Sequence, residues 1–273
     1  MNDVIKLSSP ATQEFWEIPV RFEDAHLLAL DKPAGLPTSP ARDDAARPNL
    51  MALLHAAIAA GKPWAAQRGL TYLSHSHRLD FEASGLVLLA RSKPVLVALA
   101  NWFSLEKPGR KFLALVHGTP AEDRFHVNAR IAPHPGRPGE MRVDPRNGKH
   151  AQTRFAVLEK FPRQTLLQCE PLTARPHQIR VHLQNTGLRI VGDELYGGKP
   201  LWLSRLKKDY HLKPGREERP LIARTALHAE QLTLPHPATG ETLTLTAPWP
   251  KDLKVAVKYL RQYSSPPPES GDP

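Results

Sequence analysis

The stretch HSHRLDFEASGLVLLARS, residues 75–92, places a carboxylate at the edge of an apolar run. Three basic side chains, His75, His77 and Arg78, precede Asp80, and a turn of small residues then leads into residues 86–90. An apolar run of this length, bounded by turn residues, is typical of a buried strand. A lone aspartate in a loop most often caps a turn or pairs with a nearby cation. The role of Asp80 therefore decides how the rest of the chain is interpreted.

The composition favours a protein with a polyanionic partner. The 273 residues are 41% apolar, which is enough for one main domain with a large core. The 37 Lys and Arg outnumber the 27 Asp and Glu, giving a net charge of +10 that makes nucleic acid the first candidate partner. The sequence has no apolar run long enough to span a membrane and no signal peptide, so we expect a cytoplasmic protein.

Turn residues and periodicity predict the order of elements. Strand pairs that look antiparallel, with helices between them, indicate an α+β fold. We expect a loose arm over 1–16, a single domain over 17–263 and a disordered tail over 264–273. The expected elements are two strands within 18–33, helices over 50–61 (capped by Asn49) and 93–106, a strand over 111–118, a strand pair over 151–161 and 164–172, a short helix ending at Gly187, a hairpin around 238–241 and a helix over 251–262. Residues 119–150 are rich in Pro, Arg and His, and 129–150 are expected to form a basic, solvent-facing insertion without regular elements.

Several generic sites are not predicted. The chain has neither a phosphate-binding loop nor a G-x-S-x-G nucleophile motif. His177 and His182 would lie about 140° apart on a helix, and no cysteine pair joins them or the pair His75 and His77, so we predict no metal site. The single cysteine, Cys169, lies in an extended segment and is interpreted as a small buried hydrophobe.

Five segments, in the same order, resemble motifs of the RluA-type pseudouridine synthases. HRLDFEASGLVLLA (77–90) is similar to H-R-L-D-x-x-T-S-G-L-L-L-L-A, with Ala83 in place of the threonine. The other four are DKPAGLPTSP (31–40), LTARPHQIRVHL (172–183), GDELYGG (192–198) and RTALHAEQLTLPHPATGE (224–241). The resemblance spans about residues 18–255. It implies the pseudouridine synthase fold, with a largely antiparallel mixed sheet, flanking helices and a central RNA-binding cleft.

The resemblance also implies roles for individual residues. Asp80 is expected to be the catalytic group, ionised through pairing with Arg180 or, alternatively, Arg175. Arg78 would fill the stack vacated by a flipped uridine. No cofactor or metal is implied. Contacts with the substrate are expected from His77, Arg78, Leu79, Arg175, His177 and Gln178.

Phe112 departs from the family pattern. RKFLALVHG (110–118) matches K-x-Y-L-A-L-V-x-G, but Phe112 replaces the tyrosine that stacks on the flipped uracil and has been assigned a role in removing the C5 proton. Phenylalanine keeps the aromatic face and lacks the hydroxyl. If the protein is active, water or Asp80 must take that proton.

Two other functions remain open. One is a catalytically inactive RNA-binding protein or RNA chaperone that keeps the fold. The other is a glycosidase, which requires two acids and for which Glu82 is the only nearby partner of Asp80. In the leading interpretation, a monomeric synthase isomerises uridine in structured RNA, ribosomal or transfer. It recognises its target through the catalytic domain, with the basic segments 129–149 and 203–219 as candidate contacts to the RNA backbone.

Overall fold

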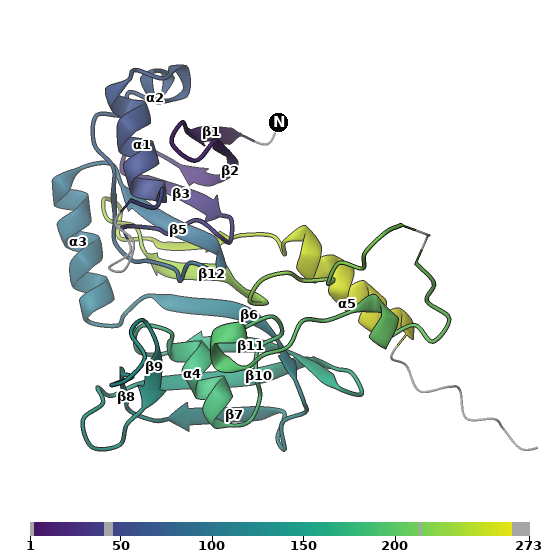
Figure 1. Cartoon of the computed structure of the whole chain (residues 1–273). Helices are drawn as coiled ribbons and strands as arrows, with labels where there is room; N and C mark the ends of the chain where they lie inside the picture. The colour runs from purple at the N-terminus through teal and green to yellow at the C-terminus, as the bar shows by residue number, and fades with distance from the viewer. Residues whose placement is uncertain (1–2, 41–45, 213–214, 264–273) are drawn as a thin grey trace, which may run out of the picture. The chain divides into compact units, whose positions relative to one another are not determined.

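The chain divides into two compact units (Figure 1). A computed structural model describes residues 3–40, 46–212 and 215–263, so the expected tail over 264–273 lies outside the described residues. The first unit comprises Met1–Lys111 with Ala229–Pro248, and the second comprises Phe112–His228 with Trp249–Pro273. The domain expected over 17–263 thus contains two units, which are described separately below. No helix in the described part of the chain has the length and apolar character needed to cross a membrane.

The first unit is built on a sheet with the strand order β1-β2-β3-β5-β12. Two further strands extend it, since β4 pairs with β5 and β13 pairs with β12. The pairs β1–β2, β2–β3 and β3–β5 are all antiparallel, and β2 and β3 correspond to the two strands expected within 18–33. Its elements are β1 (Val4–Ser9), β2 (Glu14–Glu23), β3 (Leu27–Lys32), α1 (Leu50–Ala59), α2 (Pro63–Gln67), β4 (Ser74–His75), β5 (Ser84–Ala90), α3 (Lys93–Ser104), β12 (Leu227–Pro235) and β13 (Thr242–Thr246).

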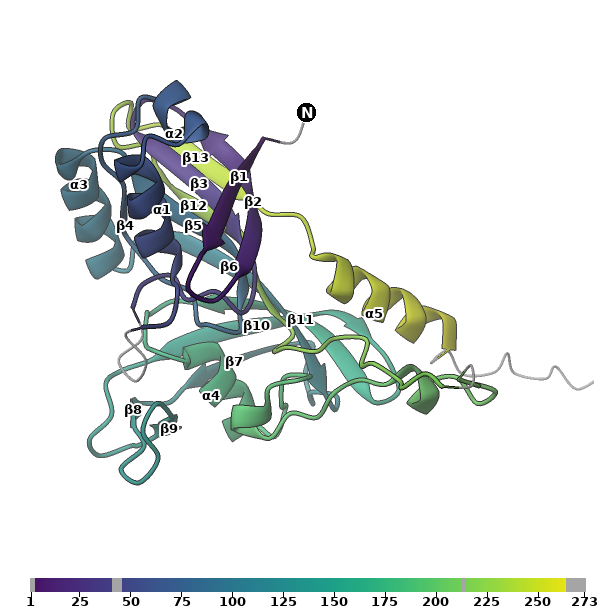
Figure 2. The same cartoon turned by 45° about the horizontal axis from the view of Figure 1, so that its top comes forward.

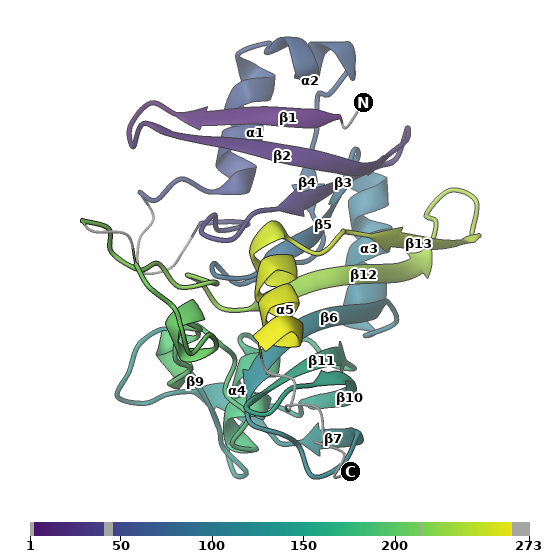
Figure 3. The same ribbon diagram turned by 90° about the vertical axis from the view of Figure 1, so that its right-hand side faces the viewer.

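The N-terminal segment is a strand where a loose arm was expected. Figure 3 shows β1 beside β2, and the register sets Ile5 opposite Ile18 and Leu7 opposite Trp16. Ile5 and Leu7 are buried, and they alternate with polar residues as in a strand with one covered face. The expectation was wrong because two apolar residues are a weak signal by themselves, and the strand forms by adding to the edge of β2.

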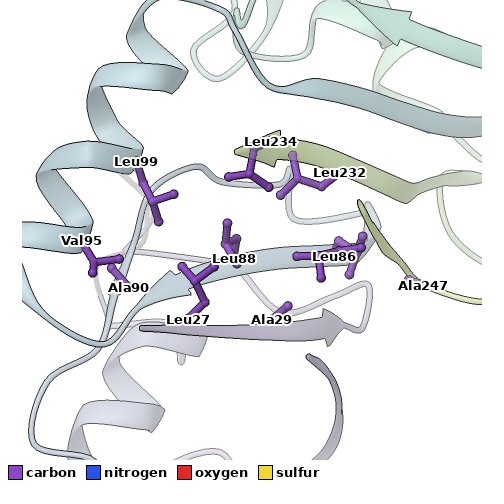
Figure 4. Packing of buried hydrophobic residues seen from close by; sticks show 11 residues of the cluster. Leu27, Ala29, Leu86, Leu88, Ala90, Val95, Leu99, Leu232, Leu234 and Ala247 are labelled. Carbon is purple, nitrogen blue, oxygen red and sulfur yellow. The ribbon is translucent and has the colours of Figure 1, made fainter. Parts of the chain in front are cut away.

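Apolar side chains from the sheet and α3 form the core of the first unit. The expected buried strand is β5, and every one of its residues is buried. Figure 4 shows Leu86 and Leu88 of β5 among residues from β3, α3 and β12, including Leu27, Leu99 and Leu232. Burial of large aliphatic side chains contributes about 1.5–3 kcal/mol each, so this cluster holds β5 in place.

The helices of the first unit begin where the sequence predicted. The Asn49 side chain accepts a hydrogen bond from the Ala52 amide (3.0 Å), which confirms it as the N-cap of α1. Helix α3 carries Pro94 in its first turn, as predicted. The short helix α2 was not predicted.

The second unit contains four strands of the large sheet, paired in the order β6-β11-β10-β7, and a separate hairpin of β8 and β9. The predicted strand pair is confirmed, because β10 and β11 are antiparallel with Phe155 opposite Cys169. Helix α4 lies beside β9 and contacts β10 and β11 (Figure 2). Its elements are β6 (Gly109–His117), β7 (Arg124–Asn128), β8 (Ile131–Pro133), β9 (Met141–Val143), β10 (Gln152–Lys160), β11 (Gln164–Pro171), α4 (Gln178–Asn185), the 3-10 turns η1 (Glu194–Tyr196) and η2 (Leu203–Arg205), and α5 (Lys251–Tyr263).

The segment 129–150 contains the strands β8 and β9, so the expectation of no regular elements there was wrong. β7 adds to the sheet edge beside β10, and β8 pairs with β9 as a hairpin. Ile131 is buried and packs with Val181 and Tyr196. The signal was missed because β8 and β9 span only three residues each and depend on distant partners for their burial.

Candidate active site

The residues on either side of Asp80 are held by the loop that follows β3. The Thr38 hydroxyl accepts the Leu79 amide hydrogen (3.1 Å) and donates to the Leu79 carbonyl (3.3 Å). The Gly35 amide donates to the Phe81 carbonyl (2.8 Å). Leu79 and Thr38 are both buried. The backbone that carries Asp80 is therefore fixed one residue before and one residue after the carboxylate.

A buried lysine stabilises the loop that holds Asp80. Lys32 is 0% exposed, and its ammonium donates to the carbonyls of Pro33 (2.8 Å) and Leu36 (2.7 Å). A buried ammonium requires such acceptors, because its transfer from water without them is very costly. Lys32 therefore fixes the turn from which Gly35 and Thr38 reach the segment of Asp80.

Gly85 brings β5 very close to β12. Its φ is +115°, and a Cβ there would lie 2.2 Å from the Ala229 carbonyl oxygen. No side chain fits at that distance, and the backbone conformation itself favours glycine. The glycine of the HRLDFEASG segment is thus required where the Asp80 turn enters the sheet.

His77 is neutral and is bound within the protein. Its Nε2 accepts a hydrogen bond from the Leu88 amide (3.1 Å), and its ring stacks on Phe103 with 4.8 Å between centroids. Burial, reinforced by the nearby charge of Arg110, lowers the pKa of His77 to about 3. These contacts fix the start of the Asp80 loop, and contact of His77 with the substrate stays a prediction. Arg78, by contrast, is exposed.

We predict that Thr38→Val impairs catalysis more than RNA binding. Valine has nearly the volume of threonine but leaves both polar groups of buried Leu79 without their partner, at a cost of about 1–3 kcal/mol for each. The adjacent Asp80 then loses its fixed position, so kcat should fall while the Kd for RNA stays near the wild-type value. Turnover and urea unfolding measure these effects. Thr12→Val, at an exposed turn, is the matched control and should change neither.

The second unit contains a buried ion pair between α4 and η1. Arg180 donates to Asp193 through Nε (2.8 Å) and Nη2 (2.7 Å), and both side chains are 1% exposed. The Arg180 guanidinium also lies over the ring of Tyr196, 4.9 Å from its centroid. This geometry fixes the guanidinium at the carboxylate and at the aromatic face. Asp193 and Tyr196 lie in the motif GDELYGG, but no sequence pattern indicates that they contact Arg180.

The residues before α4 are bonded largely within the protein. Gln178 accepts from the Thr173 hydroxyl (2.8 Å) and the Arg175 amide (3.1 Å), and its amide group donates to Gln152 and Thr153. Arg175 donates through Nε to the His150 carbonyl (2.9 Å). These contacts position the start of the helix, and a role of either residue in substrate binding stays a prediction.

Phe112 belongs to a row of side chains that crosses the sheet of the second unit. The register sets Phe112 opposite Cys169, Cys169 opposite Phe155, and Phe155 opposite Phe125. Directly opposed residues of antiparallel strands lie on one face, and the rings of Phe125 and Phe155 are stacked at 4.8 Å. Burial raises the pKa of the Cys169 thiol, in line with its interpretation as a small hydrophobe. Phe112 itself is half-buried.

The predicted site residues fall into two groups. His77, Arg78, Leu79 and Asp80 lie on one loop of the first unit, whereas Phe112, Arg175, His177, Gln178 and Arg180 belong to the second. Thr38 was not predicted, because it lies 41 residues from its partner Leu79 and only the fold brings the two together. Within the described residues, no three His, Cys, Asp or Glu side chains gather in a way that could hold a metal ion.

Known proteins resemble this chain over most of its length. The family model for RNA pseudouridylate synthase matches residues 26–185. The chain is 37% identical to ribosomal large subunit pseudouridine synthase D of Nitrosomonas europaea over 89% of its own length and 65% of the relative's. It is 32% identical to the Zymomonas mobilis protein of the same name, over 94% of the chain and 77% of the relative.

A solved structure agrees on the fold. Human RNA pseudouridylate synthase domain containing 4 superimposes with a TM-score of 0.66 at 23% identity, over 89% of this chain and 92% of that one. This likeness and the α+β architecture confirm the predicted fold. Sequence and fold thus agree that the chain belongs to the RluA-type branch of the RNA pseudouridylate synthase family, whose members are isomerases that act on RNA.

Proposed function

We propose that this protein converts uridine to pseudouridine in large-subunit ribosomal RNA, with Asp80 as the catalytic group. The reaction breaks the bond from C1′ to N1, rotates the uracil and joins C5 to C1′; C5 then loses a proton and N1 gains one, so the product is an isomer and no cofactor is required. A nucleophile or charge stabiliser is required beside C1′ and C6. The observation that carries the proposal is the carboxylate of Asp80 on a backbone fixed through Leu79 and Phe81.

Arg180 is the group that pairs with Asp80 in this proposal. Arg180 stands at the position of HQIRV where the resembling family has the arginine that pairs with the catalytic aspartate, and a guanidinium suits a carboxylate because it is planar and always charged. Arg175 is the weaker candidate, because its Nε and Nη1 donate to the carbonyls of His150 and Ala174.

Phe112 supplies an aromatic face for the rotated uracil. Stacking on an aromatic side chain contributes about 1–3 kcal/mol per base. Phenylalanine has no hydroxyl with which to take up the C5 proton, so Asp80 or a water molecule removes it. This difference affects the rate of the last step and leaves the first bond cleavage to Asp80.

Arg78 is the residue proposed to occupy the stack from which the uridine leaves. It is exposed and directly precedes the fixed segment of Leu79 and Asp80. Extrusion of a nucleotide costs a few kcal/mol in a duplex and little in a single strand. A planar guanidinium offsets part of this cost by stacking and by its charge.

Arg78→Ala should therefore reduce kcat/KM on a structured RNA by about tenfold or more and affect a short single strand much less. Tritium release from both substrates measures the ratio. Arg163→Ala, in the exposed turn between β10 and β11, is the matched loss of one charge and should leave that ratio unchanged. Equal losses of Arg78→Ala on both RNAs would contradict the role in the stack.

The choice of ribosomal RNA rests on the names of the relatives and is tested directly. Unmodified large-subunit ribosomal RNA and transfer RNA, both labelled with tritium at C5 of uridine, are incubated with the wild-type protein. We expect release from the ribosomal RNA. Release from transfer RNA alone would change the substrate class, and tight binding without release from either RNA would favour an inactive RNA-binding protein.

A further inference from the structure

The hydroxyl of Tyr196 joins two segments that carry different parts of the proposed site. It accepts a hydrogen bond from the Met141 amide of β9 (3.0 Å) and makes a second with Nδ1 of His177 (2.7 Å). His177 directly precedes α4, which carries Arg180. One phenol hydroxyl thus connects the β8–β9 hairpin to the start of the helix of Arg180.

The ring of the same tyrosine supports Arg180. The guanidinium lies 4.9 Å from the ring centroid, and Tyr196 is 2% exposed, so this contact is shielded from water. Cation–π contacts contribute about 2 kcal/mol or more when they are desolvated. Asp193, the N-cap of η1, binds the same guanidinium. The short segment of Asp193 and η1 therefore holds Arg180 through a carboxylate and an aromatic ring together.

The segment before α4 depends on such support because its backbone is strained. His177 has φ 52° and ψ 20°, a left-handed conformation that costs a non-glycine residue about 1–2 kcal/mol. The hydrogen bond to Tyr196 and an edge contact between the two rings hold the His177 side chain in place. Loss of the hydroxyl would remove one of these two restraints.

The hairpin presents positive charge on its exposed side and apolar residues to the core. Ile131 packs beside Tyr196, whereas the exposed basic residues of the hairpin and its flanks are Arg130, Arg137, Arg142, Arg146 and Lys149. Two acids in the same segment, Glu140 and Asp144, pair with Arg137 and Arg142. The segment keeps a net positive charge, which suits contact with phosphates.

We propose that Tyr196 is a positioning residue that docks the basic hairpin, which binds RNA phosphates, and that orients Arg180. The inference rests on the proposed function. The two roles of Tyr196 can be separated by mutation, because the hydroxyl binds the hairpin and His177, whereas the ring faces Arg180. Tyr196→Phe removes the first interaction and keeps the second, and Tyr196→Leu removes both.

Hydrogen exchange and RNA titration test the role of the Tyr196 hydroxyl in docking the hairpin. In Tyr196→Phe we expect the amides of 131–143 to exchange about three to ten times faster and the Kd for a large-subunit ribosomal RNA fragment to rise by a similar factor, since a hydrogen bond contributes about 0.5–1.5 kcal/mol net. The turnover rate at saturating RNA should fall less than in Tyr196→Leu. Tyr259→Phe, whose ring stacks on Tyr263 in α5, is the matched control and should alter none of these values.

The turnover rate tests the role of the Tyr196 ring toward Arg180. Tyr196→Leu should keep the loosened hairpin and also lower kcat, because Arg180 loses its aromatic support. Wild-type exchange and Kd in Tyr196→Phe would overturn the docking role, and wild-type kcat in a folded Tyr196→Leu would overturn the role toward Arg180. Absence of turnover in the wild-type protein would refute the proposed function instead, while exchange and Kd would still decide the docking role.

Discussion

Asp80→Asn should abolish turnover while RNA binding stays close to wild type. Asparagine has nearly the same volume but no negative charge, so it offers neither a nucleophile to C1′ or C6 nor stabilisation of positive charge at the sugar. Loss of a nucleophile lowers kcat by on the order of 10⁴-fold or more. The fold should tolerate the change, because the loop is held through the backbone of Leu79 and Phe81 and not only through the side chain of Asp80.

Tritium release and RNA titration, run side by side, measure this prediction. Glu82→Gln is the matched control two residues along the same loop and should stay active, whereas a glycosidase that uses two acids would lose activity in both variants. Continued release by a properly folded Asp80→Asn protein would remove Asp80 from the mechanism.

Asp193→Ala should destabilise the protein and stop turnover. It removes the Asp193 carboxylate from the Arg180 guanidinium, whose side chain is 1% exposed. Removal of one partner of a buried pair costs about 3–5 kcal/mol, because the remaining charge stays desolvated. Arg180 would also lose two of the hydrogen bonds that orient it, so activity should fall even under conditions where the protein is folded.

Urea unfolding of Asp193→Ala can be compared with that of Glu159→Ala. Glu159 pairs with Arg261 with equally short hydrogen bonds, but those side chains are 30% and 58% exposed. An exposed pair contributes about 0–1 kcal/mol, so this control should unfold near the wild-type midpoint. Equal small shifts of the urea midpoint in both variants would show that burial does not increase the contribution of the Arg180–Asp193 pair to stability.

The sequence predicted elements well where a long apolar pattern coincides with a local stop signal. β5 and α1 are examples, since one is an apolar run after a small-residue turn and the other begins at an Asn49 cap. β1 and the β8–β9 hairpin were missed because their burial depends on strands and helices far along the chain. Local periodicity carries no information on such partners.

The site was predicted unevenly for the same reason. The residues of HRLD are contiguous, so their motif identified them together, and the structure adds how their backbone is held. Thr38, Asp193 and Tyr196 act through distant partners. Asp193 and Tyr196 lay within a recognised motif, but only the packing shows that both contact Arg180.

Because Cys169 is buried, its thiol can serve as a probe of local unfolding in the second unit. The thiol is fully covered between β6 and β10, and its raised pKa keeps it in the unreactive protonated form. Because the chain has no other cysteine, alkylation of a thiol in this protein requires that these strands separate. Thiol labelling therefore follows the conformational stability of the second unit without an introduced probe, even in a complex with RNA.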